Sequence, residues 1–390
     1  MAKIQFSAFV FLFVILVNNI IPHSADETLP PTIFILGDST ADVGTNNYLP
    51  DIATAIKANF PHNGIDFPNS RPTGRFSNGF NSADFVAKFF GLKRSPAPFF
   101  FLTTLKSNHF RKHLLKGVNF ASAGSGLLDI TGPNLSVVPL SQQISQFSTV
   151  KDNLTALIGL GASEQILSKS LFFISIGSND IFGYFLSMST MPADQYIGLL
   201  ISAYSDHITN LYKLGARKFG IISVPPVGCC PSQRLVQKLI NGVDGCFQPE
   251  NDFAVAFHSA LETLLLNISS QLPGFKYSLG NGYRMTIDVI NNPHASGFEN
   301  VDSACCGIGT LNAQGPCNRT ASVCPDRRKY LFWDLYHPTK KAAYLAAQTL
   351  YNGPPYYIRW RTVLIVGLLD DECKRHRRAA VITAFVSSLL

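Results

Sequence analysis

Three short apolar runs, each ended by a loop of glycine or polar residues, constrain the fold of this chain more than any other feature. The runs cover residues 32–36, 171–176 and 218–224. Their length and their β-branched and aromatic content indicate buried strands. Longer segments with helical spacing of apolar residues cover residues 82–90, 195–214 and 252–272. Strands that alternate with helices predict an α/β fold with a mostly parallel sheet covered on both faces.

The composition is that of a folded protein with one large core. Of the 390 residues, 46% are hydrophobic and 15% are charged. These fractions supply enough apolar side chains for a core. The chain lacks the low hydrophobic content that marks disordered chains. The length also allows two average domains, but a single large α/β domain is the simpler interpretation.

The N-terminus has the layout of a signal peptide. Met-Ala-Lys precedes an apolar run over residues 6–17, and a polar stretch follows at residues 22–27. An uncleaved membrane anchor is the alternative, but the run is shorter than the roughly 20 residues that a spanning helix needs. We therefore expect export, with residues 1–25 removed and no stable membrane span.

Glycosylation triplets and cysteines fit an exported protein. The acceptor triplets begin at Asn134, Asn153, Asn267 and Asn318. All eight cysteines fall in the second half of the chain, which favours disulfides in an oxidising compartment. A zinc site built from the four cysteines between residues 305 and 324 is disfavoured, because none form a Cys-x2-Cys pair. The pairing stays open, and Cys230 and Cys373 are hard to place.

The net charge of +7 does not predict a nucleic-acid partner. The basic residues are mostly scattered, and the one dense run, residues 374–378, lies near the C-terminus. A solvated surface explains this arrangement better than a binding stripe does.

Two separated motifs supply the parts of a serine nucleophile and its base. Ser39 follows the first apolar run in a Gly-Asp-Ser loop, where a sharp turn exposes its hydroxyl. Near the other end of the chain, Asp334 precedes His337 by three residues. An acid at that spacing can reach Nδ1 of the ring and leave Nε2 to face a serine. Each motif alone has a plain structural explanation, as a turn and as a partly buried histidine.

Three groups are candidate donors to an oxyanion. They are the backbone N–H of Ser39, the backbone N–H of Gly124 in a glycine-rich loop, and the side-chain amide of Asn179 after the second run. Such donors stabilise the charge that develops when a serine attacks a carbonyl. Taken singly, a glycine-rich loop is usually a turn and an asparagine after a strand often caps a helix.

Taken in order, these motifs resemble the blocks of plant GDSL esterase/lipases of the SGNH hydrolase superfamily. The blocks are Gly37-Asp38-Ser39, Gly124 within Asn-x-Ala-Ser-x-Gly, Gly177-Ser178-Asn179-Asp180, and Asp334-x-x-His337-Pro338. Segments 74–79, 225–229 and 304–307 are also similar, and the resemblance covers residues 30–352.

The resemblance implies a flavodoxin-like three-layer α/β/α sandwich that hydrolyses carboxylic esters of acyl lipids or small molecules. It implies that Ser39 and His337 are the catalytic partners, that Asp334 orients His337, and that Gly124 and Asn179 are oxyanion donors. It implies no metal or organic cofactor, and secretion to the cell wall or apoplast. The Gly-x-Ser-x-Gly elbow of another hydrolase family is absent from the sequence.

The chain departs from the family pattern at three places. Ala123 stands where a second glycine is frequent, and Thr40 replaces the leucine of GDSL. Residues 359–390 match nothing in the family pattern, and their last apolar piece could be a lipid-anchor signal or an extra helix. An acyltransferase that uses the same acyl-enzyme, or a binding protein on the same fold, remain alternative functions. The three intact residues Ser39, Asp334 and His337 argue against the binding protein.

Overall fold

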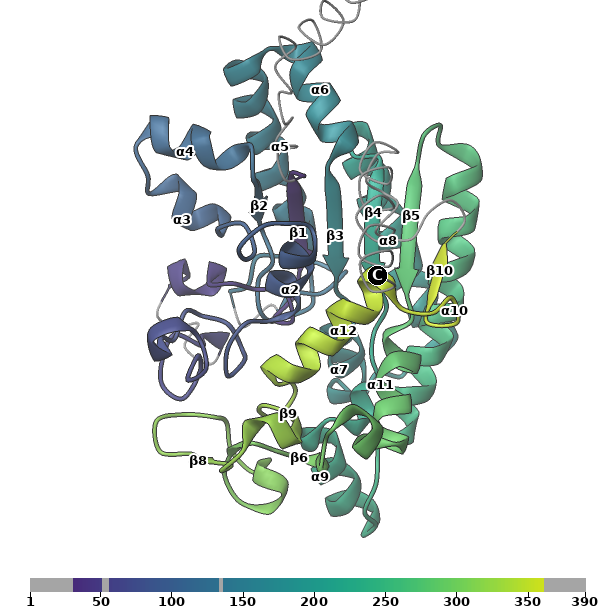
Figure 1. Cartoon of the computed structure of the whole chain (residues 1–390). Coiled ribbons are helices and arrows are strands. Elements are labelled where there is room, and N and C mark those ends of the chain that lie inside the picture. The colour runs from purple at the N-terminus through teal and green to yellow at the C-terminus, as the bar shows by residue number, and fades with distance from the viewer. Residues whose placement is uncertain (1–30, 51–55, 133–135, 361–390) are drawn as a thin grey trace, which may run out of the picture. The chain divides into compact units, whose positions relative to one another are not determined.

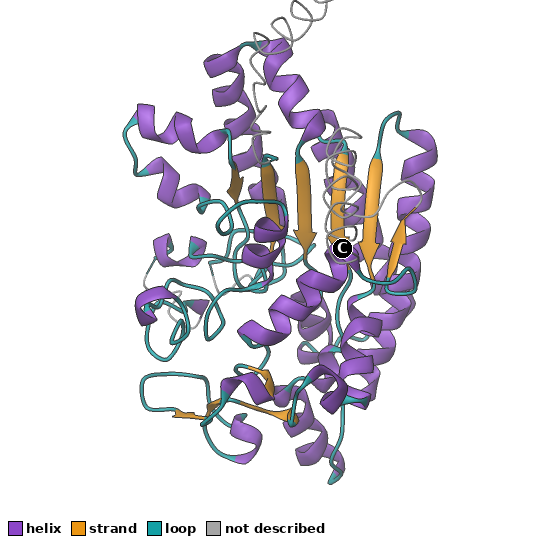
Figure 2. Cartoon of the chain, viewed as in Figure 1, coloured by secondary structure: helices purple, strands orange, loops and turns teal. Residues whose placement is uncertain are grey.

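The computed structural model describes residues 31–50, 56–132 and 136–360, and it is built around one six-stranded sheet. The strand order is β10-β5-β4-β3-β1-β2. The strands are β1 Ile33–Gly37, β2 Gly117–Asn119, β3 Leu171–Ser175, β4 Lys218–Ile222, β5 Lys276–Gly280 and β10 Ile358–Trp360. Strands β1 to β5 are parallel and β10 is antiparallel, as the arrows in Figure 2 show. The order β2-β1-β3-β4-β5 is the flavodoxin-like doubly wound order, so the predicted fold class is confirmed.

Helices cover the sheet and join its strands. They are α2 Ser82–Phe89, α3 Phe99–Thr103, α4 Ser107–Leu114, α5 Leu140–Ile158, α6 Leu160–Lys169, α7 Ser178–Leu186, α8 Ala193–Lys213, α9 Pro231–Asn241, α10 Gln248–Gln271, α11 Gly282–Asn291 and α12 Lys340–Asn352. The helices predicted from apolar spacing correspond to α2, α8 and α10, with ends that differ by a few residues. Figure 1 shows α12 crossing the sheet near the carboxyl ends of its central strands.

Each face of the sheet has its own hydrophobic core. Alternate residues of a strand point to opposite faces, so Phe34 and Leu36 of β1 pack on one side while Ile33 and Ile35 pack on the other. Helices α5, α8 and α10 bury one side of each helix in the first core. Helices α2 and α12, with Met285 of α11, fill the second core. These are the three layers that the resemblance implied.

Helix α10 is long and apolar enough to cross a membrane, with a mean hydropathy of 1.2. One side of this helix is buried against the sheet through Phe253, Phe257, Leu261 and Leu265. A core helix of a globular domain has the same character, so α10 is weak evidence for a span.

Three disulfides hold the second half of the described chain. They are Cys229–Cys246, Cys305–Cys324 and Cys306–Cys317. The last two lie in the region of the small strands β6 Asn300–Ala304, β7 Cys306–Gly307, β8 Ser322–Val323 and β9 Tyr330–Phe332, where Cys306 belongs to β7 and Cys324 follows β8. Disulfide formation is thus confirmed, and these four cysteines are unavailable to zinc. Cys230 is a buried free thiol, and Cys373 lies outside the described residues.

A short strand follows the residue at which we expected the domain to end. We expected the domain to end at residue 352 and an atypical tail to begin at 359. In the structure, β10 pairs with β5, with Ile358 opposite Gly280, so the sheet extends to residue 360. A three-residue edge strand is too short to leave a periodic signal in the sequence. The expected signal peptide and the remainder of the tail lie outside the described residues.

The glycosylation triplets fall in different surroundings. Asn267 is exposed on α10, whereas Asn153 on α5 and Asn318 in a loop are half-buried. Asn153 Nδ2 donates to the carbonyl of Thr149 at 2.8 Å, which ties that amide to its own helix. Asn134 lies outside the described residues. The exposed Asn267 is therefore the most accessible acceptor of the described three.

Candidate active site

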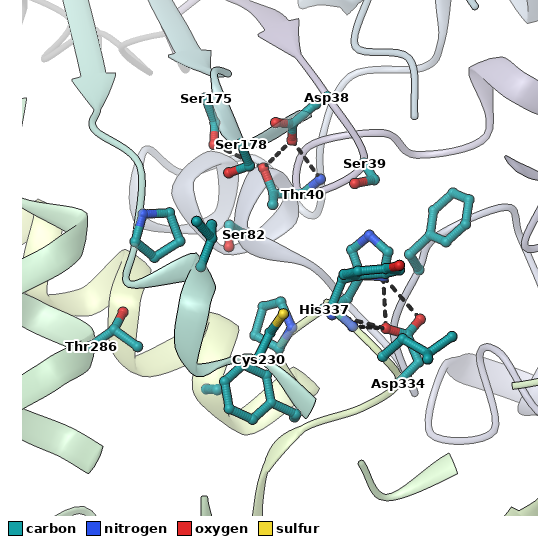
Figure 3. A pocket seen from close by; sticks show the side chains of 18 of the residues that line it. Asp38, Ser39, Thr40, Ser82, Ser175, Ser178, Cys230, Thr286, Asp334 and His337 are labelled. Atoms are coloured by element: carbon teal, nitrogen blue, oxygen red, sulfur yellow. Dashed lines mark hydrogen bonds and ion pairs between the residues drawn. The ribbon is translucent and has the colours of Figure 1, made fainter. Parts of the chain in front are cut away.

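A cavity of about 540 Å³ opens at the carboxyl ends of β1, β3 and β4, where ligands of doubly wound sheets bind. All five residues predicted from the sequence line it: Ser39, Gly124, Asn179, Asp334 and His337. They come from three loops and the first turn of α7, and only the fold brings them together. Figure 3 shows Ser39, Asp334 and His337 around the same space.

The backbone of the Ser39 loop leaves the sheet by a sharp turn. Gly37, the last residue of β1, has φ 150°, and a Cβ there would lie 2.2 Å from the carbonyl oxygen of Ser175. The Asp38 N–H donates to that same oxygen at 3.0 Å. The neighbouring strand therefore requires glycine at position 37, and Ser39 is placed half-exposed in the turn that follows.

Thr40 takes part in fixing this turn. Its N–H and its hydroxyl donate to Asp38 Oδ1 at 3.0 and 2.8 Å, and its Oγ1 lies 2.8 Å from Ser175 Oγ. Burial raises the pKa of Asp38, and the bonds from Thr40 oppose that rise. A leucine could not make these side-chain bonds, so the departure from GDSL adds contacts between the loop and β3.

Asp334 holds both the ring and the backbone of His337. The Nδ1 atom of His337 lies 2.8 Å from Asp334 Oδ1 and 2.9 Å from Oδ2. Asp334 Oδ1 also accepts the N–H groups of Tyr336 and His337, at 3.0 and 2.8 Å. The Trp333 N–H closes the loop on the His337 carbonyl at 2.7 Å. Nδ1 is thus the protonated nitrogen, and Nε2 is left as an acceptor.

The segment at residues 74–79 supports the histidine from the side. The ring of Phe76 packs against the imidazole, with 4.9 Å between centroids. Arg75, the preceding residue, forms a buried ion pair with Asp84 of α2, with Nε–Oδ2 at 2.6 Å and Nη2–Oδ1 at 2.8 Å. This bidentate pair anchors the segment that carries Phe76.

Ser39 Oγ has no hydrogen-bond partner among the described residues, His337 included. The bond between a nucleophile and its base is often long in a free enzyme and tightens when substrate binds. The serine and the histidine thus share a cavity without being locked to each other.

Two backbone N–H groups at the site have no acceptor in the part of the chain that the structure describes: those of Ser39 and Gly124. Their neighbours are all used, since Asp38 donates to Ser175, Thr40 to Asp38, and Ala123 to Asp42. Two free N–H groups on one cavity wall can bind an oxyanion.

Asn179 is the third candidate donor. Its Nδ2 donates to the carbonyl of Ser125 at 2.8 Å, which ties α7 to the loop that carries Gly124. An amide nitrogen has two hydrogens, so the second remains for another acceptor. This bond links two of the three candidate donors, Asn179 and Gly124.

Ser223, which lines the same cavity, contacts a second histidine, His258, but this histidine has the wrong tautomer for a base. Ser223 Oγ lies 2.9 Å from His258 Nδ1, and the Asn281 amide nitrogen lies 3.0 Å from His258 Nε2. Asn281 Oδ1 accepts the Arg284 N–H, which fixes its amide. An amide nitrogen only donates, so Nε2 accepts and Nδ1 carries the proton. His258 therefore donates to Ser223 and cannot take its proton.

Comparison with known proteins decides the family. The model of the family GDSL-like Lipase/Acylhydrolase matches residues 33–350. The chain belongs to this family. It is 39% identical to GDSL esterase/lipase At5g55050 of Arabidopsis thaliana over 84% of this chain and 87% of that protein. It is 33% identical to Arabidopsis GDSL esterase/lipase LTL1 over 92% and 97%. Family membership makes the chain a carboxylic ester hydrolase.

Two buried carboxylates position the Gly124 loop of this GDSL family member, and the sequence analysis missed both. Asp42 accepts the N–H groups of Gly44 and Thr45 and, on its other oxygen, that of Ala123. Asp180 accepts the N–H groups of the residues at positions 127 and 128 and a hydroxyl at position 131. Burial raises the pKa of each to about 6, although these bonds oppose the rise. The two acids hold the loop from both sides.

Gln143 of α5 is a further residue that sequence reasoning missed. Its Oε1 accepts the Gly37 N–H at 2.9 Å, and its Nε2 donates to the Gly37 carbonyl at 2.9 Å. The same Nε2 reaches the carbonyl of Val138 and the hydroxyl of Ser125. The side chain is fully buried, so it links the GDSL loop to the Gly124 loop away from solvent.

Replacing Gln143 by leucine is expected to destabilise the fold. The change removes the bonds to the buried Gly37 N–H and the Val138 carbonyl, and a buried backbone group costs about 1–3 kcal/mol when unpaired. We expect the free energy of unfolding to fall by about 2–4 kcal/mol in urea titrations. Gln142→Leu is the matched control, since Gln142 is exposed on the same helix. Equal urea midpoints for the two variants would show that the hydrogen bonds of Gln143 do not stabilise the fold.

Proposed function

We propose that this chain is an exported serine esterase/lipase in which Ser39 forms an acyl-enzyme. Ser39 Oγ attacks the ester carbonyl while His337 Nε2 takes its proton, and Asp334 keeps the imidazole oriented. The oxyanion binds the N–H groups of Ser39 and Gly124 and the amide of Asn179. Collapse of the tetrahedral adduct breaks the bond to the alkoxy oxygen, which receives the proton from His337.

Water completes the cycle. It attacks the acyl carbon while His337 removes its proton, and the released Ser39 oxygen recovers a proton as the carboxylic acid leaves. His337 acts as base and acid in turn. The observation that carries this proposal is the coincidence, in one cavity, of a half-exposed serine, an imidazole oriented by a carboxylate, and two backbone N–H groups without an acceptor.

Export is part of the proposal. The N-terminal layout, three disulfides among the described cysteines and the exposed Asn267 support it. Disulfides persist in oxidising compartments and are rare in the cytosol. We place the protein outside the cell, in the cell wall or apoplast.

One experiment tests the function with protein collected from the medium of expressing plant cells. The secreted protein is expected to lack about residues 1–25 and to release p-nitrophenol and free acid from p-nitrophenyl butyrate. Added butanol separates hydrolysis from transfer, because a transferase makes butyl butyrate in place of acid. A folded secreted protein that binds the ester without turning it over would instead support a binding protein.

A further inference from the structure

The cavity extends away from Ser39 into a space between helices α11 and α12. Four residues of each helix line it, and in both helices they follow the spacing i, i+3, i+4, i+7. They are Gly282, Met285, Thr286 and Val289 of α11, and Ala342, Leu345, Ala346 and Thr349 of α12. That spacing places each set on one face of its helix. We call the space between these two faces the interhelical arm.

The interhelical arm borders the apolar clusters of the fold, since Met285 belongs to the second core and Ala342 to a small cluster with Phe298 and Phe332. Helix α12 packs on the sheet through Ala343, Ala347 and Leu350, which lie on a different face from the one that lines the arm. The face toward the arm is also apolar, apart from Thr349. Helix α12 is thus apolar on two sides, one packed on the sheet and the other along the cavity.

Small residues keep the arm open. Ala342 and Ala346 on the α12 wall have short side chains, which leave room beside this helix. Protein interiors are otherwise packed as densely as organic crystals, and an unfilled apolar space forfeits dispersion contacts. Apolar cavities of this kind stay dry and bind apolar molecules. The walls therefore fit a hydrocarbon chain.

The arm is continuous with the reacting groups. Helix α12 begins at Lys340, three residues after His337, so the base and one wall of the arm belong to the same segment. Figure 3 draws Thr286 and Cys230 together with Ser39 and His337 as residues that line one cavity. Burial raises the pKa of Cys230, so this thiol stays neutral and acts as part of an apolar wall.

We propose that the interhelical arm binds the acyl chain of the substrate and that Ala346 sets how long that chain can be. The inference rests on the proposed function, since it takes Ser39 as the acylated residue. The acyl group stays attached to Ser39 until water arrives, whereas the alcohol must leave first. A space flanked by two helices therefore suits the acyl group, which stays on the enzyme, better than the alcohol, which leaves first. Long-chain acyl esters are accordingly the preferred substrate class.

The test is the ratio of kcat/KM for p-nitrophenyl palmitate to that for p-nitrophenyl acetate. Ala346→Phe places an aromatic ring in the arm and is expected to lower this ratio by on the order of 100-fold. Acetate hydrolysis is expected to fall far less than palmitate hydrolysis, because the acetyl group ends before the arm. The control is Ala156→Phe, the same change at an exposed position of α5 outside the cavity.

Val289→Phe repeats the test from the facing helix, so a folding defect in one variant does not decide the result. An unchanged palmitate-to-acetate ratio in both folded variants overturns the proposal. So does a selective loss of hexadecyl acetate hydrolysis with palmitate retained, since the arm would then hold the alcohol chain.

Binding of cis-parinaric acid, a fluorescent long-chain fatty acid, tests the arm independently of ester hydrolysis. Wild type and Ser39→Ala are expected to bind it, and Ala346→Phe to bind it at least tenfold more weakly. Binding without any ester turnover would refute the proposed hydrolysis while leaving the arm in place. Turnover with equal binding by Ala346→Phe would refute the arm alone.

Discussion

Ser39→Ala is expected to lower kcat for p-nitrophenyl butyrate by on the order of 10⁵-fold, because it removes the atom that forms the acyl-enzyme. The residual rate over water would come from the oxyanion donors and from substrate binding. KM should change little, since the cavity walls are untouched. Steady-state kinetics on the purified variant measure both quantities.

The urea midpoint distinguishes a loss of catalysis from a loss of folding in this variant. Ser39 Oγ has no hydrogen-bond partner among the described residues, so its removal should leave the urea midpoint unchanged. Ser202→Ala, an exposed serine of α8, is the matched control and should retain full activity. A Ser39→Ala protein that keeps more than a tenth of the wild-type kcat would remove Ser39 from the mechanism.

Asp334→Asn is expected to lower kcat by on the order of 10⁴-fold while preserving the fold. An asparagine Oδ1 can still accept the backbone N–H groups of Tyr336 and His337, which Asp334 Oδ1 accepts now. Its amide would then face His337 Nδ1 and force that nitrogen to be an acceptor. The proton would move to Nε2, and the imidazole could no longer deprotonate Ser39.

The measurement for Asp334→Asn is kcat together with the rate of inactivation by a serine-directed phosphonate. Both should fall in parallel, because both require the same base. Asp152→Asn on the exposed surface of α5 is the control. A fall in kcat with an unchanged inactivation rate would mean that Asp334 acts after acylation, contrary to this account.

The sequence predicted the strands that carry the strongest local signal. Strands β1, β3 and β4 are five-residue, nearly fully buried runs, so their apolar character is continuous. Strand β2 has three residues, and β5 contains Lys276 and Ser278, so neither shows a clear pattern. Pairing with β1 and β4 determines their structure, and such long-range contacts are not visible in a short window.

For the candidate site, the sequence predicted the residues that face the cavity but not those that hold them. Ser39, Gly124, Asn179, Asp334 and His337 stand in recognisable motifs. Asp42, Asp180 and Gln143 act through contacts with residues 53 to 106 positions away in the sequence. A buried carboxylate or amide has no local sequence pattern, because it hydrogen-bonds to backbone groups that only the fold brings near.

The interhelical arm could also not be predicted from the sequence. The i, i+3, i+4, i+7 faces of α11 and α12 look like ordinary core faces when each helix is considered alone. Only their arrangement in space shows that they line a cavity. The core face of α12, with Ala343 and Ala347, carries the same small residues and is filled.

The most direct test of the account is to find which serine a phosphonate ester labels. We predict one label per folded wild-type molecule, on the peptide that contains Ser39, and slower labelling when substrate is present. Ser223 lines the same cavity beside His258, so it is the internal alternative. Labelling of Ser223, or hydrolysis by a protein that takes up no label, would contradict the assignment of Ser39 as the nucleophile.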